Sequence, residues 1–136
     1  MDPAPHRLPV RVYYEDTDFS GVVYHANYLR FLERGRTELL RSAGVDQSIL
    51  HAEPGGIIFA VRRMNIEYLR PARMDDLLTI ETETTEIRGA SLRMSQRILR
   101  ADAVLLTAGV HVAVLAGGRP ARLPDEIRRL LQRRAP

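Results

Sequence analysis

Apolar and polar side chains alternate along five separate stretches of the chain. This period of two is typical of strands that bury one face and expose the other. The last four stretches follow one another through short connections, one of them at Gly89, which predicts an antiparallel meander. The five stretches are residues 10–15, 63–68, 78–84, 92–98 and 104–114.

A long helix is predicted between the first two stretches, and Gly44 is a natural end for it. Its apolar positions recur at helical spacing, while arginine and glutamate fill much of its remaining surface. Gly35 lies inside this helix and costs up to ~1 kcal/mol relative to alanine. We therefore expect another backbone to approach Gly35 closely, as in a sheet wrapped around the helix. The apolar side of the helix consists of Tyr28, Phe31, Leu32, Gly35, Leu39 and Ala43.

The order of elements predicts an α+β fold in one domain, residues 1–136. A five-stranded antiparallel sheet packs on the long helix, and a short C-terminal helix opens at Pro124 with Ile127 on its apolar side. We expect residues 1–6 and 133–136 to be flexible. One helix cannot cover both faces of such a sheet, so partner subunits are expected to cover part of the other face.

The composition excludes several classes of function. The 136 residues include no cysteine, which rules out disulfides, thiolate catalysis and cysteine-bound zinc. All 20 basic residues are arginine and are scattered along the chain, so we expect no nucleic-acid binding. The N-terminal residues contain no apolar signal core, and no apolar run reaches membrane-spanning length. We therefore expect a cytoplasmic protein without stable membrane insertion.

The segment from Tyr14 to Tyr28 carries the strongest chemical signal in the chain. Asp18, the turn residue Gly21 and His25 stand directly ahead of the long helix. The start of a helix gathers unpaired N–H groups and the positive end of the helix dipole. Such a place stabilises a developing oxyanion, and a carboxylate beside it can act on the same carbonyl group. This combination suits acyl transfer.

This segment resembles the hotdog-fold acyl-CoA thioesterases of the 4-hydroxybenzoyl-CoA thioesterase family, above all their bacterial Tol-Pal-associated branch. Residues 33–38, 68–76 and 89–96 support the likeness, which runs from about Arg7 to Leu115. The residues that carry it read Asp16-Thr17-Asp18-x-x-Gly21-x-Val23-Tyr24-His25-x-Asn27-Tyr28.

The resemblance implies a hotdog fold, in which a sheet wraps the long helix and two protomers pair their sheets. It further implies active sites at the dimer interface, a homodimer or homotetramer, and no metal or prosthetic group. The expected reaction is hydrolysis of acyl-CoA thioesters. Acyl carrier protein thioesters are a second substrate class to consider.

Asp18 matches the family's catalytic aspartate. It would act either as a nucleophile that forms a mixed anhydride or as a general base that activates water. The plainer interpretation is an aspartate that caps the turn before Gly21. The backbone N–H of His25 is the expected oxyanion donor. Its side chain would orient Asp18 or water or protonate the leaving thiolate, unless it is simply a solvent-facing histidine of the first helical turn.

Three further residues of this segment are weaker candidates. Tyr14 would place its hydroxyl in the substrate pocket, although a tyrosine of an alternating strand is usually part of the core. Asn27 is a good helix cap by its chemistry. Asp16 is interpreted as a charged loop residue, because the family match puts the catalytic carboxylate two positions later.

The remaining substrate contacts are expected elsewhere in the chain. Ile58 and Phe59 would line the acyl pocket, with residues 46–54 near its entrance. Arg88 matches a position where basic residues approach the nucleotide part of coenzyme A, and Arg70 and Arg73 are runners-up. For any one of these arginines the alternative is a solvated surface charge.

Other functions were weighed against thioester hydrolysis. Asp16, Asp18 and His25 offer oxygen and nitrogen ligands for a metal, but the other histidines show no tight ligand spacing. Ser20 lacks the glycine-flanked elbow of a serine hydrolase. A hydratase would need a different arrangement of histidine and acid. A catalytically silent hotdog protein that binds acyl-CoA or acyl carrier protein as a sensor or complex component is the main alternative, because fold alone does not establish activity.

Overall fold

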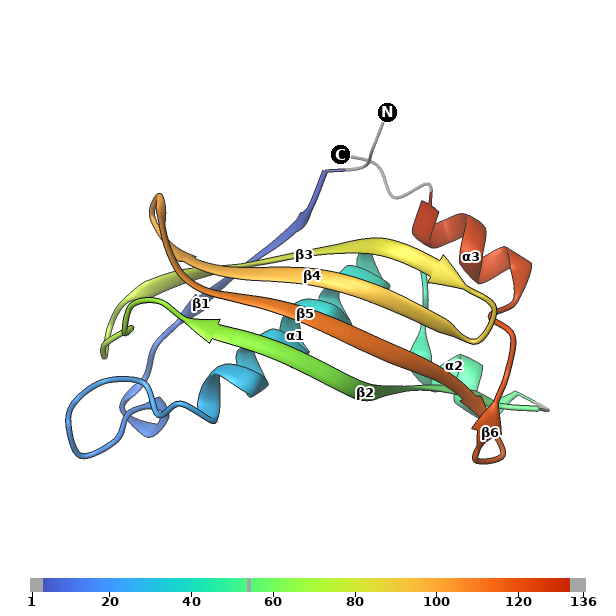
Figure 1. Cartoon of the computed structure of the whole chain (residues 1–136), viewed down its shortest axis with the longest axis horizontal. Helices are drawn as coiled ribbons and strands as arrows, with labels where there is room; N and C mark the ends of the chain where they lie inside the picture. Colours follow the sequence, from blue (N-terminus) through green and yellow to red (C-terminus); the bar gives the residue numbers. More distant parts are fainter. Residues whose placement is uncertain (1–3, 54, 133–136) are drawn as a thin grey trace.

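The computed structural model describes residues 4–53 and 55–132, and it has the expected α+β architecture of a curled antiparallel sheet around one long helix (Figure 1). The elements in chain order are β1 (His6–Arg11), the 3₁₀ turn η1 (Tyr14–Asp16), α1 (Asn27–Ser42), α2 (Gln47–Ala52), β2 (Ile57–Tyr68), β3 (Leu77–Arg88), β4 (Ser91–Arg100), β5 (Ala103–Ala116), β6 (Arg119–Pro120) and α3 (Asp125–Gln132). Residues 1–3 and 133–136, where flexible ends were predicted, lie outside the described residues, whereas His6 already begins β1.

The strands lie in the order β1-β3-β4-β5-β2, with the two-residue β6 beside β5. The predicted meander is therefore correct only for β3, β4 and β5. Strand β2 lies at the far edge because the segment after Tyr68 crosses the end of the sheet. There Leu69 donates to the carbonyl of Leu105, and Val12 donates to that of Asp76. Alternation shows which side chains are buried, but it does not show which strands are neighbours.

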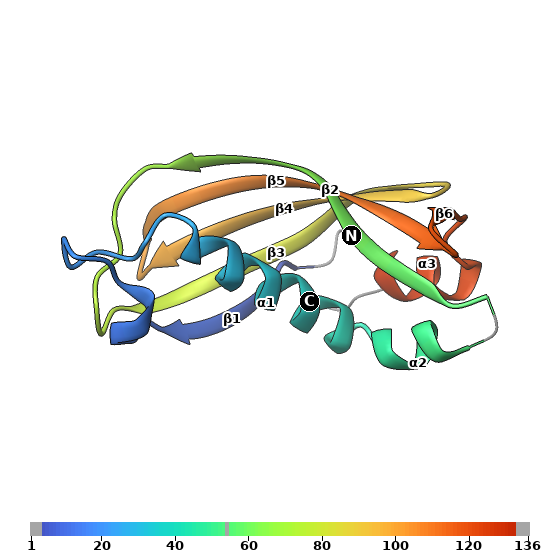
Figure 2. The ribbon, with the colours of Figure 1, turned by 90° about the horizontal axis from the view of Figure 1, so that it is seen from below.

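Helix α1 lies against the concave face of the sheet (Figure 2). Gly35 is needed in mid-helix because neighbouring side chains leave no room for a Cβ. A Cβ added to Gly35 would lie 2.6 Å from Cγ2 of Ile80 and 2.8 Å from Oγ1 of Thr82. Gly35 is thus closely approached, but by side chains of β3 and β4 rather than by the backbone that was predicted. At the end of the helix Gly44 has a φ of 90°, which only glycine adopts easily.

Two hydrophobic clusters fill the space between helix and sheet. The first surrounds Phe31 and Leu32 in the N-terminal part of α1. The second surrounds Leu39 and Leu40 in the C-terminal part, and Ile127 of α3 packs into it. Each fully buried side chain of this kind contributes about 1.5–3 kcal/mol to folding. The core thereby fixes the position of both ends of α1.

The first strand lies four residues nearer the N-terminus than its pattern indicated, at His6–Arg11 instead of 10–15. It ends at Arg11, and Tyr14 begins the 3₁₀ turn with 79% of its surface exposed. The backbone turns here because Oδ2 of Asp16 accepts a hydrogen bond from the N–H of Tyr13 at 2.8 Å. Residues 46–54, expected as a loop, contain the helix α2 with Asp46 as its side-chain cap. Within the described residues no helix is long and apolar enough to cross a membrane.

Candidate active site

The loop ahead of α1 is a tight hairpin, closed by one β-bridge within it and tied by a second to the segment after β2. Thr17 and Val23 form an antiparallel bridge, and Val22 bridges to Arg73. Gly21 has a φ of 83° at the turn, and its N–H donates to the carbonyl of Asp18 at 3.0 Å. This is the left-handed conformation that favours glycine, so Gly21 shapes the turn that presents Asp18.

Asp18 is exposed on this hairpin and bound to Ser20. Its Oδ1 accepts hydrogen bonds from the Ser20 hydroxyl at 2.6 Å and from the Ser20 N–H at 2.9 Å. The hydrogen bond from the Ser20 hydroxyl is the largest cause that holds the pKa of Asp18 below its usual range. The turn-capping geometry is therefore present. The same contacts keep the carboxylate ionised, so capping and catalysis are compatible at this residue.

Asp16 is not the simple loop charge that its sequence context suggested. It is 9% exposed, and its Oδ1 accepts a 2.9 Å hydrogen bond from the side-chain amide of Asn27. The prediction that Asn27 caps the helix is also wrong. Ala26 occupies the N-cap position without a side-chain hydrogen bond, and Asn27 is the first helical residue. The two buried side chains pair with each other because neither would find water at that depth. Their contact ties the hairpin to the start of α1.

His25 lies in the turn just before α1, two residues ahead of Asn27. Among the residues that the structure describes, no group accepts a hydrogen bond from its backbone N–H. Its carbonyl oxygen accepts one from the hydroxyl of Tyr68 at 2.8 Å. The imidazole is exposed, with its ring centroid 4.6 Å from that of Tyr24. A free N–H near the positive end of a 16-residue helix is suited to hold an oxyanion.

A surface cavity of about 310 Å³ opens beside this N–H and is mainly apolar. Tyr68 was not expected here, although it ends a predicted strand, because its partner is a backbone carbonyl that leaves no sequence signal. Tyr28 accepts a hydrogen bond from the N–H of Ala72 at 3.0 Å and so closes the inner side. The cavity is lined by Val23, His25, Tyr28, Tyr68, Leu69, Arg70 and Pro71.

The other predicted substrate contacts lie at the opposite end of the same chain. Strand β2 runs away from α2, so Ile58 and Phe59 lie at the far end from Tyr68 (Figure 1). Phe59 lines a second cavity, of about 210 Å³, whereas Ile58 is 40% exposed and does not line it. Arg88 ends β3 near α3, is exposed, and forms an ion pair with Glu86. One chain alone therefore does not bring these residues to Asp18.

The second cavity contains an arginine that the sequence did not single out. Nη1 of Arg36 donates to Oε1 of Gln96 at 3.1 Å, and Nε2 of Gln96 donates to the carbonyl of Leu32 and to Oγ1 of Thr82, both at 2.9 Å. Burial lowers the pKa of Arg36. Gln96 was visible in the sequence as a polar residue at an inward-facing strand position. A buried amide needs hydrogen-bond partners, and this requirement was the signal that could have pointed to Arg36.

No group of three or more histidine, cysteine, aspartate or glutamate side chains in the described ranges is arranged to hold a metal ion. Asp16 and Asp18 were weighed as joint ligands, but their carboxylates contact different partners, Asn27 and Ser20. The arrangement at the start of α1 consists of an ionised carboxylate, a free backbone N–H and an apolar cavity. These are the groups that acyl transfer needs.

Comparison with known proteins decides the family. A model of the thioesterase superfamily matches residues 20–107, which is more than half of the 136 residues. The chain belongs to the thioesterase superfamily. The matched residues include the glycine turn, His25 and the whole of α1.

Individual relatives agree with this assignment. The acyl-CoA thioester hydrolase YbgC of Escherichia coli O6:H1 is 48% identical over 130 residues, which are 93% of this chain and 96% of that protein. A probable thioesterase from Bartonella henselae is 48% identical with a TM-score of 0.85, over 89% of this chain and all of that one. A thioesterase from Thermus thermophilus, solved with coenzyme A and Zn, is 30% identical with a TM-score of 0.83, over 96% and 94% of the two chains. The expected hotdog-fold thioesterase is confirmed.

Proposed function

We propose that this thioesterase hydrolyses acyl-CoA thioesters to the free acid and coenzyme A, with Asp18 as the acting carboxylate. The observation that carries the proposal is the free N–H of His25 at the start of α1, beside the hairpin that holds Asp18. The name of the Escherichia coli relative and the coenzyme A in the Thermus thermophilus structure support the choice of substrate.

Two reaction routes are considered, and both pass through a tetrahedral intermediate that carries an oxyanion. Either the Asp18 carboxylate attacks the thioester carbonyl and gives a mixed anhydride, or it takes a proton from a water molecule that attacks instead. In both routes the carbonyl oxygen becomes an oxyanion, which accepts the hydrogen bond of the His25 N–H. The oxyanion then collapses and the C–S bond breaks, and the thiolate takes a proton from the His25 imidazole or from water. In the general-base route this step gives the free acid. In the nucleophilic route it leaves the mixed anhydride, which a water molecule then hydrolyses to the free acid and the Asp18 carboxylate.

The hairpin with Asp18 and the cavity at Phe59 meet, one from each protomer, if two protomers pair through strand β2. This strand has 12 residues and forms an edge of the sheet, so its outer row of backbone groups is free to pair. A two-fold axis across an antiparallel β2–β2 pair places the Phe59 end of one strand beside the Tyr68 end of the other. The 210 Å³ cavity of one protomer then faces the partner's Asp18, and Arg88 comes to the same side of the assembly.

We propose that the acyl group enters the Phe59 cavity and that Arg88 meets a phosphate of coenzyme A. In this arrangement Gly21 shapes the hairpin, and Ile58 contacts substrate or partner from the strand edge. Tyr14, exposed in its own chain, would reach substrate only across the interface. A homodimer is the minimum assembly, and a homotetramer is compatible with it. Light scattering that found a fully active monomer at assay concentration would defeat this arrangement.

A hydrolysis panel tests the activity against the silent alternative. The purified protein is given acyl-CoAs of increasing chain length, one aromatic acyl-CoA and an acyl carrier protein thioester, and release of free thiol is followed. We expect turnover on at least one acyl-CoA. Tight binding of acyl-CoAs without thiol release from any of them would identify a sensor or complex component instead. No metal or prosthetic group is added in the assay, because the proposed route uses only groups of this chain.

A further inference from the structure

A row of basic side chains crosses the outer face of the sheet, the face turned away from α1. Arg63 on β2 pairs with His111 on β5, His111 pairs with Arg93 on β4, and Arg93 pairs with Glu86 on β3. Directly paired residues of antiparallel strands have their Cβ atoms about 4.5–5.5 Å apart. Three basic side chains therefore stand side by side, and Arg62 lies next to them in an irregular step of β2.

The charge of this row is not balanced within the chain. Glu86, the acid at its end, is shared, because Oε2 lies 3.3 Å from Nε of Arg93 while Oε1 pairs with Arg88. In the ranges that the structure describes, Arg62 and Arg63 form no ion pair. Arg63 and Arg93 lie on either side of His111, so two guanidinium charges gather on the same face of the sheet. The row therefore keeps an excess of positive charge at one place on the sheet.

Arg63, Arg93 and His111 line a cavity of about 190 Å³. Asn65 and Ser95 add neutral hydrogen-bonding groups to it. Its floor is open at Gly109, where an added Cβ would meet no atom within 4 Å. The cavity thus combines a basic rim, neutral donors and free space over the strands.

We propose that this outer cluster, made of Arg62, Arg63, Arg93 and His111, binds a phosphate-type oxyanion at a site separate from Asp18. A guanidinium group offers paired donors that match the oxygens of phosphate. A dianion would relieve the repulsion within the row. A single cavity holds one such group, whereas a nucleic acid would need a continuous basic stripe. The proposal rests on the register of the strands and not on the reaction that the protein catalyses.

The imidazole of His111 gives a direct readout. Burial first, and then the nearby Arg93, Arg62 and Arg63, lower the pKa of His111, while Glu86 acts in the opposite direction. A bound phosphate adds negative charge beside the imidazolium, so the pKa of His111 should rise. We expect inorganic phosphate, followed by histidine NMR, to raise this pKa in a saturable way. A rise equal to that caused by sodium chloride at the same ionic strength would overturn the proposal.

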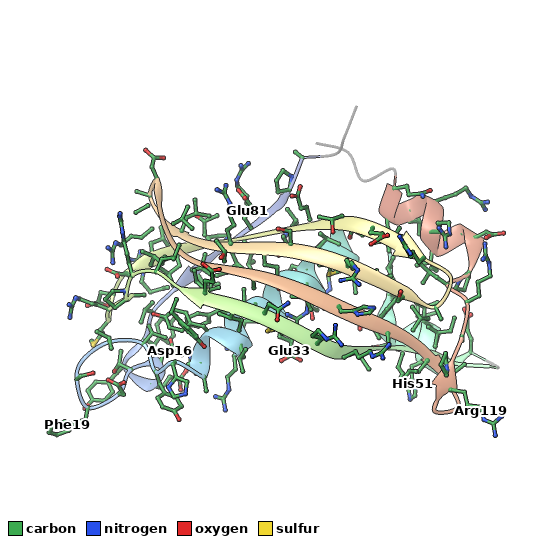
Figure 3. All side chains as sticks on the ribbon, in the orientation of Figure 1. Asp16, Phe19, Glu33, His51, Glu81 and Arg119 are labelled. Carbon is green, nitrogen blue, oxygen red and sulfur yellow. The ribbon has the colours of Figure 1, made fainter. Side chains whose placement is uncertain are left out.

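Matched variants separate a site from general charge. Arg63→Gln breaks no ion pair of the described chain and should weaken phosphate binding about tenfold or more, as expected for a lost charge-assisted hydrogen bond. Arg119→Gln removes the same charge at β6, which does not line the cavity (Figure 3), and should leave binding unchanged. Equal losses in the two variants would overturn the proposal.

Further measurements test whether the variants are folded and whether the row faces another protomer. Circular dichroism confirms that the variants are folded, and Arg93→Gln serves if Arg63→Gln is not. A variant that changed the oligomeric mass in light scattering while it kept its phosphate affinity would show that the row faces another protomer, and would overturn the proposal. The source of the phosphate follows from competition. Displacement of inorganic phosphate by coenzyme A but not by dephospho-coenzyme A assigns the site to the coenzyme's 3′-phosphate, and displacement by neither assigns it to free phosphate.

Discussion

The two ends of α1 build their sites in different ways. At the loop end, residues 13–28 with 68–73, the contacts of the two carboxylates are local, Asp18 with Ser20 and Asp16 with Asn27, although Tyr68 reaches His25 from 43 positions away. At the cavity end, around Phe59 and Arg36, the hydrogen bonds that reach α1 join residues 60 and 64 positions apart, Arg36 with Gln96 and Gln96 with Leu32. Figure 3 shows the distance between the ends, with Phe19 at one extreme and Arg119 at the other.

This difference indicates separate roles. The loop end offers an ionised carboxylate and a free N–H on an exposed hairpin, so it can approach a reacting carbonyl. The cavity end offers a space lined by both apolar and polar side chains, in which the partly buried guanidinium of Arg36 is held by the side-chain amide of Gln96. Chemistry is thus expected to depend on the loop end, and the selection of substrate on the cavity end, each contributed by a different protomer.

The largest effect is expected at the loop end, from Asp18→Asn. Asparagine can still accept the hydrogen bonds of Ser20, so the hairpin and the melting temperature should stay unchanged. The loss of the ionised carboxylate should lower kcat by about 10²–10⁴-fold, the contribution of a positioned general base, or by more if Asp18 is the nucleophile. Thiol-release kinetics measure it, with Glu15→Gln as a control. Near-wild-type turnover would end the carboxylate mechanism.

Gly35→Ala should destabilise the packing of α1 against the sheet, which connects the loop end to the cavity end. The added Cβ would stand 2.6 Å from Ile80 and 2.8 Å from Thr82, so strand or helix must move. Overpacking of this kind costs about 1–3 kcal/mol, which outweighs the gain in helix propensity. Chemical denaturation should show the loss of stability. Gly109→Ala is the matched control because open space surrounds that position, and equal losses in both variants would contradict a close approach at Gly35.

At the cavity end, Arg88→Ala should affect binding and leave the chemistry intact. A phosphate contact present in both ground and transition states raises KM and leaves kcat nearly unchanged. We expect about a fivefold rise in KM for acyl-CoA, the size of an exposed charge contact, and a smaller rise at high salt. Arg119→Ala should show no such change. If the variant lost activity equally on an acyl-pantetheine, which lacks the nucleotide, Arg88 would not contact the coenzyme.

The smallest effect concerns pH. The hydrogen bonds from Ser20 hold the pKa of Asp18 below its usual range, so the active, ionised form persists to lower pH. Ser20→Ala removes the largest of these contributions and should move the acidic limb of kcat/KM to higher pH. Thr17→Val, which loses only a hydrogen bond to the carbonyl of Tyr14, should leave the limb in place. An unchanged limb in Ser20→Ala would mean that a group other than Asp18 titrates there.

Much of the fold and half of the site were predictable because their signals are local. Helical spacing located α1 within one residue at each end, and alternation located β3, β4 and β5. The cost of Gly35 correctly indicated a crowded position, although the crowding comes from side chains of the sheet and not from its backbone. The errors at Tyr14 and Asn27 share one cause, since the carboxylate of Asp16 binds the backbone of Tyr13 and the side chain of Asn27. A spacing rule does not reveal which of several nearby polar groups a buried carboxylate will choose.

The sequence by itself determined the family, the helix and the turn at Gly21, because neighbouring residues encode those features. Only the tertiary structure decided that β2 crosses to the edge beyond β5, that Gln96 fixes Arg36 beneath the helix, and that Arg63, His111 and Arg93 stand in one row. These facts depend on strand order and register. Both are set by how the whole sheet closes around α1, which no local stretch of sequence contains.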